Sequence, residues 1–366
     1  MFSIIEQLTA DSDPTPARCS EAAENDPLLT IALNSIRGQG LRLVIDYLVW
    51  LHGQGVCESI DGSPEVLQLI DARLAEEPSP AVLSVLGRHF TTTVALDQEW
   101  AASLADRLFA SRPSETDRHD PWCAYLAEGV TLRAFRTLEP FYERHVARLG
   151  ESAEIGDCER NLVHHLLPVY WWGEIGEIDS GDEGLIGRLF ATAPPALRAY
   201  AVEYAGLSLY RTEGVLDENV ARRFRALWNW RRTSAESAVD RVAHASEAQA
   251  FEWWFTSDKL DEQWSLENLE WTLEVGPGPR HPHATALRLG VIARRSPAKL
   301  APVLHCYELL IAAADENSQL LGWVEDLRDP LSWAITTGQD EAAASGRAIA
   351  NMLVARGFLG FRDLAR

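Results

Sequence analysis

The stretch SPAKLAPVLHCYELLI at residues 296–311 decides the fold class. Its Ser296-Pro297 pair places a potential N-cap acceptor before a proline at the first helical position, where the missing N–H costs nothing and the fixed φ suits a helix. The apolar residues that follow recur at i, i+3, i+4, i+7, i+10 and i+11: Leu300, Val303, Leu304, Tyr307, Leu310 and Ile311. That spacing forms one stripe along an α-helix, so it predicts an amphipathic helix over 297–313.

The same signature recurs along the chain. Ser63-Pro64, Ser79-Pro80 and Asp120-Pro121 repeat the helix start, and the run from Leu41 to Leu48 repeats the helical stripe. Alternating Val-, Ile- and Thr-rich runs bounded by Asn-Gly or Asp-Gly turns, which would indicate strands, are missing from the sequence. The sequence therefore predicts an all-α protein with helices at 27–54 (broken near 38–40), 64–77, 80–91, 97–110, 121–136, 139–149, 153–173, 183–192, 195–211, 217–233, 247–256, 261–274, 283–295, 297–313, 317–336 and 340–356.

So many short helices are too many for the single core of a helix bundle. The connections between them are short, which makes successive helices antiparallel neighbours. We expect a right-handed solenoid of antiparallel helix pairs with degenerate HEAT- or armadillo-like repeats, because each pair can then bury its apolar stripe on the next. The expected division is a loose leader at 1–26, an N-terminal half at 27–193 and a C-terminal half at 194–366, forming one continuous array. A closed α/α toroid fits the same pattern.

The composition is that of an acidic globular protein. Hydrophobic residues make up 46% of the 366 residues, and 54 acidic against 33 basic residues give a formal net charge of −21. Such a field repels phosphate backbones, so no nucleic-acid partner is expected. The densest basic stretch, residues 222–232, interleaves arginines with aromatic residues and predicts a helix with one apolar stripe and one solvated basic side.

The cysteines are odd in number and far apart: Cys19, Cys57, Cys123, Cys158 and Cys306. This usage predicts reduced thiols in a cytoplasmic protein rather than a disulfide framework. The first residues show no basic region followed by a long apolar region, and no run of about 18 apolar residues occurs anywhere. The sequence thus predicts neither a secretory signal nor a membrane partner.

The sequence lacks the residue patterns that several kinds of catalysis require. Lys259 and Lys299 are the two lysines, and neither stands in the Gly-Lys-Ser/Thr context of a nucleotide P-loop. Both stand among polar helix-start residues rather than in an apolar pocket, which does not suit a Schiff-base lysine. The zinc motifs C-x-x-C and H-E-x-x-H, the G-x-S-x-G nucleophile elbow and the Asp-Asp pair of terpene cyclases are also missing. The sequence predicts no catalytic residue and no cofactor.

Two histidine pairs are candidate metal ligands. His281 and His283 flank a proline in a Gly- and Pro-rich loop, but no third ligand is evident nearby, so a surface turn is the simpler interpretation. His164 and His165 point about 100° apart on a helix, which predicts packing or capping instead of shared coordination. The sequence therefore predicts no metal site.

The most acidic loop spans residues 174–184. Its carboxylates could bind calcium or act as acid and base, but the spacing is not that of an EF-hand. Asp182 and Glu183 suit the first turn of the next helix, where the helix dipole favours negative charge. We accordingly expect that neither ATP nor a divalent metal stabilises the chain.

Two pairs of adjacent tryptophans lie on helical patterns, namely Trp171-Trp172 and Trp253-Trp254. Neighbouring side chains on a helix diverge by about 100°, so one ring of each pair can pack in the core while the other projects elsewhere. Exposed tryptophans are frequent in partner sites. These four residues are the candidate partner-contact residues, with burial between layers as the alternative for most of them.

Several segments, taken in order, resemble the C-terminal helical region of large bacterial antiviral STAND-type NTPases and related multidomain defence proteins. They are Ala32–Gly38, Pro195–Arg198 with Gly206, Leu227–Arg231, Phe251–Phe255 with Trp264, and Ala355–Phe358. The resemblance implies a helical-repeat array that senses a phage component or supports assembly, while an upstream NTPase and effector carry out the chemistry. Neither upstream module is found in this sequence, so the resemblance implies a fragment or a stand-alone relative and transfers no catalytic residue.

Two functions remain open from the sequence. The first is a non-enzymatic recognition or scaffold module that binds an unidentified protein partner, in antiphage defence as the resemblance implies. The alternative is a helical-toroid enzyme whose pocket, lined by tryptophans and carboxylates, takes a carbohydrate-like substrate. A deep cavity with two facing carboxylates would favour the enzyme, and an open surface without such a cavity would favour the recognition module.

Overall fold

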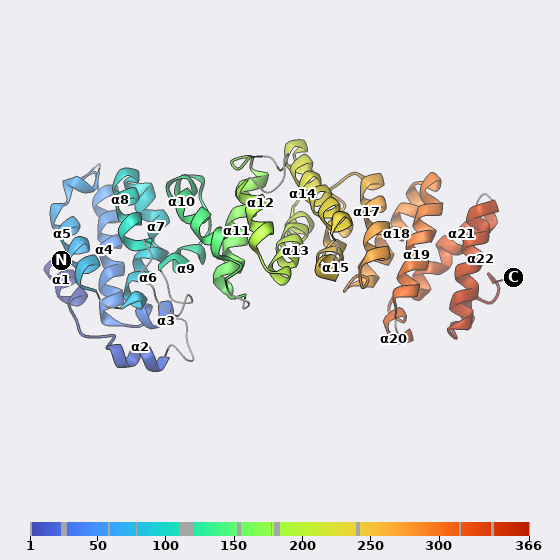
Figure 1. The fold of residues 1–366 in the computed structure, drawn as a ribbon, viewed down its shortest axis with the longest axis horizontal. Coiled ribbons are helices and arrows are strands. Elements are labelled where there is room, and N and C mark those ends of the chain that lie inside the picture. Colours follow the sequence, from blue (N-terminus) through green and yellow to red (C-terminus); the bar gives the residue numbers. More distant parts are fainter. Residues whose placement is uncertain are drawn as a thin grey trace. The chain divides into compact units, whose positions relative to one another are not determined.

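Helices form all the regular structure of the described residues (Figure 1). The computed structural model describes residues 2–22, 28–57, 59–77, 79–109, 121–151, 155–176, 178, 184–238, 242–314, 316–337 and 340–365. No strand occurs within these ranges, which confirms the all-α prediction. The chain divides into two compact units, here called unit 1 (Met1–Tyr170 with Asp182–Thr192) and unit 2 (Trp171–Gly181 with Ala193–Arg366).

Unit 1 packs short helices on near neighbours in the sequence. Helix α4 packs on α1, α3 and α6, helix α6 packs on α9, and helix α10 packs on α7, α8 and α12. The elements are α1 (Phe2–Thr9), α2 (Pro16–Ala22), α3 (Leu28–Leu33), α4 (Ile36–Gly53), η1 (Ile60–Gly62), α5 (Pro64–Glu76), α6 (Pro80–Arg88), α7 (Phe90–Leu96), α8 (Gln98–Phe109), α9 (Pro121–Leu126), α10 (Leu132–Arg148), α11 (Asp157–Trp171) and α12 (Leu185–Thr192).

Unit 2 arranges most of its helices in two layers. One layer runs through α13, α15, α17, α19 and α22, and the other through α16, α18 and α21, with α16–α17, α18–α19 and α21–α22 contacts between the layers. The elements are α13 (Pro195–Arg211), α14 (Glu218–Ser237), α15 (Val242–Gln249), α16 (Glu252–Thr256), α17 (Glu262–Val275), α18 (Pro282–Arg295), η3 (Pro297–Lys299), α19 (Leu300–Ala313), α20 (Asn317–Leu320), η4 (Val324–Leu327), α21 (Arg328–Thr337), α22 (Asp340–Ala355) and η5 (Leu359–Phe361).

Several helices begin at the prolines from which the sequence predicts a helix start. The serine before the proline does not cap the helix as expected. Pro64, Pro80 and Pro121 begin α5, α6 and α9. Neither Ser63 nor Ser79 makes a side-chain cap hydrogen bond. Side-chain caps come from Ser35 of α4, Asp97 of α8, Thr131 of α10, Asp217 of α14 and Asp261 of α17, none of which precedes a proline. Thr15, which precedes Pro16 at the start of α2, also accepts a hydrogen bond from the Arg18 N–H at 3.2 Å.

The break predicted near residues 38–40 lies earlier in the structure. Chain direction changes before Ser35, whose hydroxyl oxygen accepts a hydrogen bond from the Gly38 N–H and so caps α4. Gly38 and Gly40 lie inside α4 because other backbone approaches them there. A Cβ on Gly38 would lie 1.9 Å from the Ala32 carbonyl oxygen, and one on Gly40 would lie 2.8 Å from the α1 backbone. These glycines permit close helix packing rather than a helix break.

The predicted leader at 1–26 is ordered wherever the structure describes it. Helix α1 packs on α4 and buries Ile5. The Asp13 carboxylate accepts a hydrogen bond from the Ile36 N–H at 2.9 Å, and the Arg37 guanidinium donates to the carbonyl oxygens of Asp11 and Pro14. The polar groups of this segment form hydrogen bonds with the backbone and side chains at the start of α4. The segment is therefore held in place there although its composition is polar.

Each core contains a cluster of aromatic side chains. In unit 1, Trp122 is fully buried and contacts Phe109, Tyr142 and the imidazole ring of His145. In unit 2, the rings of Phe251, Trp254 and Trp271 surround Trp228. Phe251 directly precedes α16, Trp254 belongs to α16 and Trp271 belongs to α17.

Helix α10 runs through Pro140 without the interruption that the sequence predicts at residues 137–138.

Candidate functional site

The four candidate tryptophans differ in exposure. Trp254 is buried in the core of unit 2, where its indole N–H donates to the Val202 carbonyl oxygen at 2.9 Å, so it cannot contact a partner in this fold. Trp171 is half-buried because its ring stacks on Phe224 with 4.7 Å between centroids. Trp253 is half-buried against Tyr210. Trp172 is 50% exposed and is the one tryptophan of the four with a largely free ring.

A second surface group lies on α4, where the sequence indicated only the buried stripe, and in it Leu43 and Trp50 are exposed and Tyr47 is half-buried. Leu43, Tyr47 and Trp50 follow at i, i+4 and i+7 on the side of α4 opposite its buried residues. The Tyr47 and Trp50 rings stack with 5.9 Å between centroids, and Phe2 of α1 lies 5.8 Å from Tyr47. The Trp50 side chain is 51% exposed. We call Phe2, Leu43, Tyr47 and Trp50 the aromatic surface.

The apolar pattern of α4 indicates this surface. Helix α4 has one apolar stripe that contains Leu41 and Leu48 and a second that contains Leu43 and Trp50. A helix at the edge of a globular unit normally buries one stripe and exposes polar residues on the other side. A second apolar stripe on such a helix is an exposed patch of the kind that marks interaction sites.

A cavity of about 200 Å³ lies in unit 2 between α14, α15 and α17. Its lining combines an indole ring, two carboxylates and an imidazole: Ala235, Glu236, His244, Ala245, Trp271, Glu274 and Val275. Burial lowers the pKa of His244, so this imidazole is neutral at pH 7. Typical small-molecule sites enclose about 300–1,000 Å³, so the cavity is small for a substrate pocket.

Beside the cavity lies a buried charged group centred on Glu247 of α15, whose carboxylate is 4% exposed. Its Oε2 accepts a hydrogen bond from Arg231 Nε at 2.8 Å, and its Oε1 accepts one from Arg198 Nε at 3.0 Å. His244 Nδ1 lies 3.2 Å from the same Oε1. The arrangement joins α13, α14 and α15, so its role is to hold three helices together.

The outer side of α17 carries another group of potential ligands. Glu270 and Glu274 lie one turn apart on α17, and His305 faces them from α19. One ligand atom of each residue lies within 4.8 Å of the other two, and among the described residues this is the group of three that could hold a metal ion. Glu274 belongs to this group and also lines the cavity.

The loops singled out in the sequence do not assemble a metal site among the described residues. His281 Nδ1 lies 2.9 Å from Oε1 of the buried Glu252, and the His281 N–H donates to Oε2 of that carboxylate at 2.7 Å. Neither His281 nor His283 belongs to a group of three potential ligands there. Most of the acidic loop 174–184, including Asp182 and Glu183, lies outside the described residues.

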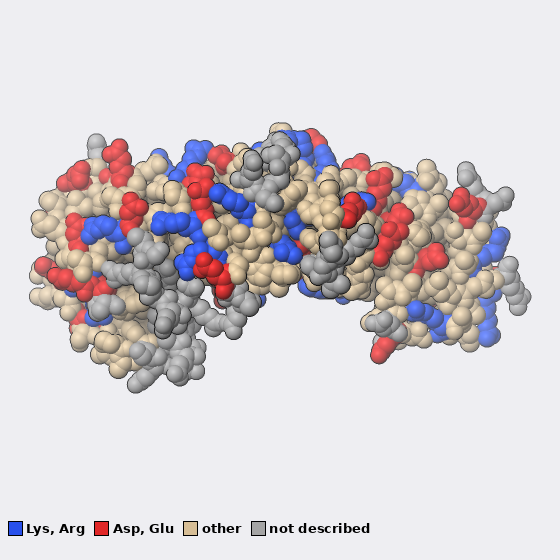
Figure 2. All heavy atoms as spheres, viewed as in Figure 1, with Lys and Arg blue, Asp and Glu red and all other residues tan. Residues whose placement is uncertain are grey.

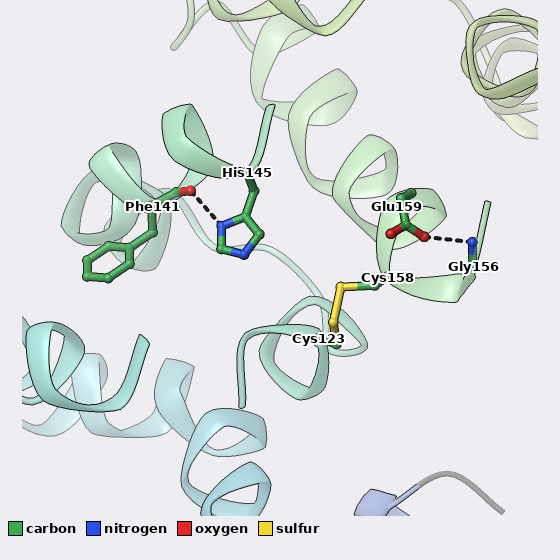
Figure 3. Close-up of a disulfide and its surroundings, with 6 residues drawn as sticks. All are labelled: Cys123, Phe141, His145, Gly156, Cys158 and Glu159. Atoms are coloured by element: carbon green, nitrogen blue, oxygen red, sulfur yellow. Dashed lines mark hydrogen bonds between the residues drawn. A yellow bond between two sulfur atoms is a disulfide. The ribbon is translucent and has the colours of Figure 1, made fainter. Parts of the chain in front are cut away.

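The prediction of reduced thiols is wrong for one pair of cysteines (Figure 3). Cys123 of α9 and Cys158 of α11 form a disulfide, with Cα atoms 5.0 Å apart. Cys19, Cys57 and Cys306 are free. The pair is separated by 35 residues in the sequence. No local pattern brings the two cysteines together, because their contact depends on how α11 packs against α9.

The arginine-rich helix α14 is also only partly as predicted. Arg223 and Arg231 are buried rather than solvated: Arg223 donates to the Ile175 carbonyl oxygen at 3.0 Å, and Arg231 binds Glu247.

Figure 2 shows acidic and basic side chains interspersed on the face in view. No helix of the described residues is both long and apolar enough to cross a membrane.

His165 of α11 is packed inside unit 1, as predicted for the His164-His165 pair. The Tyr125 and Tyr142 hydroxyl oxygens lie 2.9 Å apart, and the Tyr142 hydroxyl lies 2.6 Å from His165 Nδ1. His165 Nε2 lies 2.7 Å from the Glu128 carbonyl oxygen, which can only accept. Nε2 therefore carries the proton, Nδ1 accepts from Tyr142, and Tyr142 accepts from Tyr125. Burial lowers the pKa of His165 to about 4.

This chain of hydrogen bonds predicts acid sensitivity. The His165 pKa is about 4 in the folded state, below its value of 6.5 in the unfolded state, so the unfolded state binds the proton more tightly. The contribution to stability is complete above pH 6.5 and is lost as the pH falls towards 4, by about 3 kcal/mol in all. Urea unfolding between pH 7 and pH 4 measures this loss. An NMR titration that places the His165 pKa at 6 or above would contradict it.

Comparison of the chain with protein-family models, curated proteins and solved structures finds no match.

Proposed function

We propose that the chain is a non-enzymatic recognition or scaffold module that binds a protein partner through the aromatic surface. The observation that carries the proposal is the second apolar stripe of α4. The buried stripe of α4 already packs against α1, α3 and α6. Leu43 and Trp50 therefore add exposed apolar area beside the half-buried Tyr47, and aromatic side chains are enriched in protein interfaces.

The net charge favours a particular kind of partner. A formal charge of −21 makes a second copy of this chain an unfavourable occupant of the surface, because like charges repel on approach. It attracts a basic protein at long range, and the aromatic rings then provide apolar contacts at short range. We therefore propose a basic protein that presents apolar side chains as the partner, and neither a nucleic acid nor a membrane.

The wider setting is part of the same proposal. The two-layer packing of unit 2 supports a right-handed solenoid of degenerate HEAT- or armadillo-like pairs, because each helix pair there contacts the next. The resemblance to the C-terminal region of antiviral STAND-type NTPases supports a role in bacterial antiphage defence. With these we propose a cytoplasmic location, in which a disulfide such as Cys123–Cys158 would be unusual.

A photo-crosslinking amino acid placed at position 50 tests the surface directly. In cells that make the full chain, we expect it to crosslink to a defined basic protein, whereas the same amino acid at Val215, which is 98% exposed in unit 2, should not. Trp50→Ser should then weaken binding of that purified protein by about 30-fold, the effect of losing a hot-spot side chain worth about 2 kcal/mol. Val215→Ser is the matched control and should leave the affinity unchanged.

Three outcomes would contradict the proposal. The first is crosslinking at position 50 to a second copy of the chain, which would make the aromatic surface a dimer interface. The second is the same set of crosslinked proteins at positions 50 and 215. The third is unchanged affinity of Trp50→Ser for a partner that crosslinks at position 50, provided that circular dichroism shows the variant folded.

The cavity in unit 2 favours the enzyme as second candidate. Trp271 provides a ring on which a sugar could stack, and Glu236 and Glu274 provide two carboxylates, as expected for a carbohydrate-like substrate. At about 200 Å³ the cavity is smaller than typical ligand pockets. The recognition module therefore remains the first proposal.

A further inference from the structure

We propose that Glu270, Glu274 and His305 bind a divalent first-row transition-metal ion, with Zn²⁺ as the expected occupant. The proposal is independent of the partner surface on α4, because the three ligands lie on α17 and α19 of unit 2. It also replaces the expectation that no divalent metal stabilises the chain. That expectation rested on ligand spacing along the sequence, whereas His305 meets the glutamates only through the packing of α19 on α17.

The distances around His305 match a coordination sphere better than a hydrogen-bond network. His305 Nε2 lies 3.5 Å from Glu270 Oε1 and 4.0 Å from Glu274 Oε1. Both distances exceed the usual hydrogen-bond range of about 2.7–3.2 Å. Two ligands bound at 2.0–2.1 Å in a tetrahedral site lie about 3.4 Å apart. The three donor atoms all lie within 4.8 Å of one another, so side-chain rotations would have to shorten the longer separations to reach the spacing around an ion.

The other nitrogen of the imidazole faces a third carboxylate. His305 Nδ1 lies 3.8 Å from Glu308 Oε2, which is on the next turn of α19. Metal-binding histidines generally donate their second ring N–H to a carboxylate, carbonyl or water, which fixes the tautomer and leaves the first nitrogen free to bind. Glu308 is placed to act in this way, directly or through a water molecule, so that Nε2 carries the lone pair for the metal.

The negative charges of the carboxylates around His305 also favour a bound cation. Like charges at i and i+4 on a helix destabilise it, and the Glu270–Glu274 pair on α17 has that spacing. Within the described part of the chain, no arginine or lysine forms an ion pair with Glu270, Glu274 or Glu308. Many other Asp and Glu side chains there are paired with arginine. A divalent ion at this place would neutralise two of the three carboxylates and remove their repulsion.

The donor set selects the class of metal. One imidazole nitrogen and two carboxylate oxygens suit Zn²⁺ and the neighbouring transition metals, whereas Mg²⁺ and Ca²⁺ prefer oxygen ligands alone. Three protein ligands leave a position of a tetrahedral ion for water or for another donor. All three side chains are partly exposed, so an ion can enter from solvent.

Calorimetric titration of the metal-free full chain with ZnCl₂ tests the proposal, with MgCl₂ in a parallel titration. We expect one Zn²⁺ per chain and no saturable Mg²⁺ binding. His305→Ala and Glu270→Gln should each weaken Zn²⁺ binding by at least about 100-fold, since each removes a ligand, and Glu308→Gln by about 10- to 100-fold, the effect of losing an outer-shell carboxylate.

Glu267→Gln is the matched control. It lies on the same helix, removes the same charge and has Gln263 as its hydrogen-bond partner, so its Zn²⁺ affinity should equal that of the unchanged protein. X-ray absorption of the Zn²⁺ complex should show only nitrogen and oxygen neighbours. Circular dichroism of each variant without metal separates loss of the site from loss of the fold.

Three results would overturn the proposal. One is the absence of saturable Zn²⁺ binding by the unchanged chain. Another is equal Zn²⁺ affinity for His305→Ala, Glu270→Gln and Glu267→Gln, which would mean that exposed carboxylates bind the ion without a site. The third is sulfur in the first shell, which would assign the ion to cysteines. None of these results depends on whether the aromatic surface binds a protein.

Discussion

Replacing Glu247 by alanine is expected to destabilise the chain by about 3–5 kcal/mol, the range found when one member of a buried charged group is removed. The carboxylate is buried and binds Arg231 and Arg198 from two other helices. Its removal leaves two guanidinium groups in the interior without that negative charge, and the cost of burying a charge is then no longer offset. Urea or thermal unfolding of the purified variant measures the loss.

Exposed and buried pairs can be compared directly in this chain. Glu218, at the start of α14, pairs with Arg225 but its side chain is 80% exposed, so Glu218→Ala should cost no more than about 1 kcal/mol. Glu247→Gln keeps the size and one acceptor oxygen and should fall between the two. If Glu247→Ala costs as little as Glu218→Ala, the buried group does not hold α13, α14 and α15 together.

Trp228→Ala is the second change with a large expected effect, again about 3–5 kcal/mol, the usual cost of emptying a buried aromatic site. The Trp228 ring lies 4.2 Å from Phe251 between ring centroids, and its indole N–H donates to Asn268 Oδ1 at 2.7 Å. Alanine removes contacts to two neighbouring helices at once, because Phe251 precedes α16 and Asn268 belongs to α17. Denaturant unfolding gives the magnitude.

Hydrogen exchange shows how far the effect of Trp228→Ala spreads. If stability is a sum of local terms and contacts between neighbours, protection should fall in α14, α16 and α17 and remain in unit 1. Uniform loss of protection in both units would instead indicate a single cooperative core. Trp172→Ala is the control: its ring is half exposed, so we expect a small change in stability without a spread.

The candidate sites were much harder to predict than the fold. Trp172 was identified from the sequence and is exposed, but Trp254 was identified in the same way and is buried. Adjacent residues on a helix differ by about 100° in direction, and only the neighbouring helices decide which direction is the interior. The exposed Trp50 lies on a helix whose first apolar stripe already predicts packing, so that stripe alone does not indicate an exposed ring.

The burial of charged side chains was equally hard to predict from the sequence. Arg223 and Arg231 belong to a stretch that was expected to be half solvated, and both are buried against partners far away in the sequence. Long side chains on a helix bury or expose their charge according to what packs beside them. A partner such as Glu247, which follows Arg231 by 16 residues, cannot be inferred from helical periodicity.

The sequence by itself determined that the described residues are helical and where several of the helices begin. Apolar spacing and proline placement act within one or two turns of a helix, so they identify helices such as α5, α6 and α19 without knowledge of their neighbours. Tertiary structure alone decided the Cys123–Cys158 disulfide, the buried Glu247 group and the meeting of His305 with α17. Each of these depends on which helices pack together, and such contacts join residues whose separation along the chain carries no periodic signal.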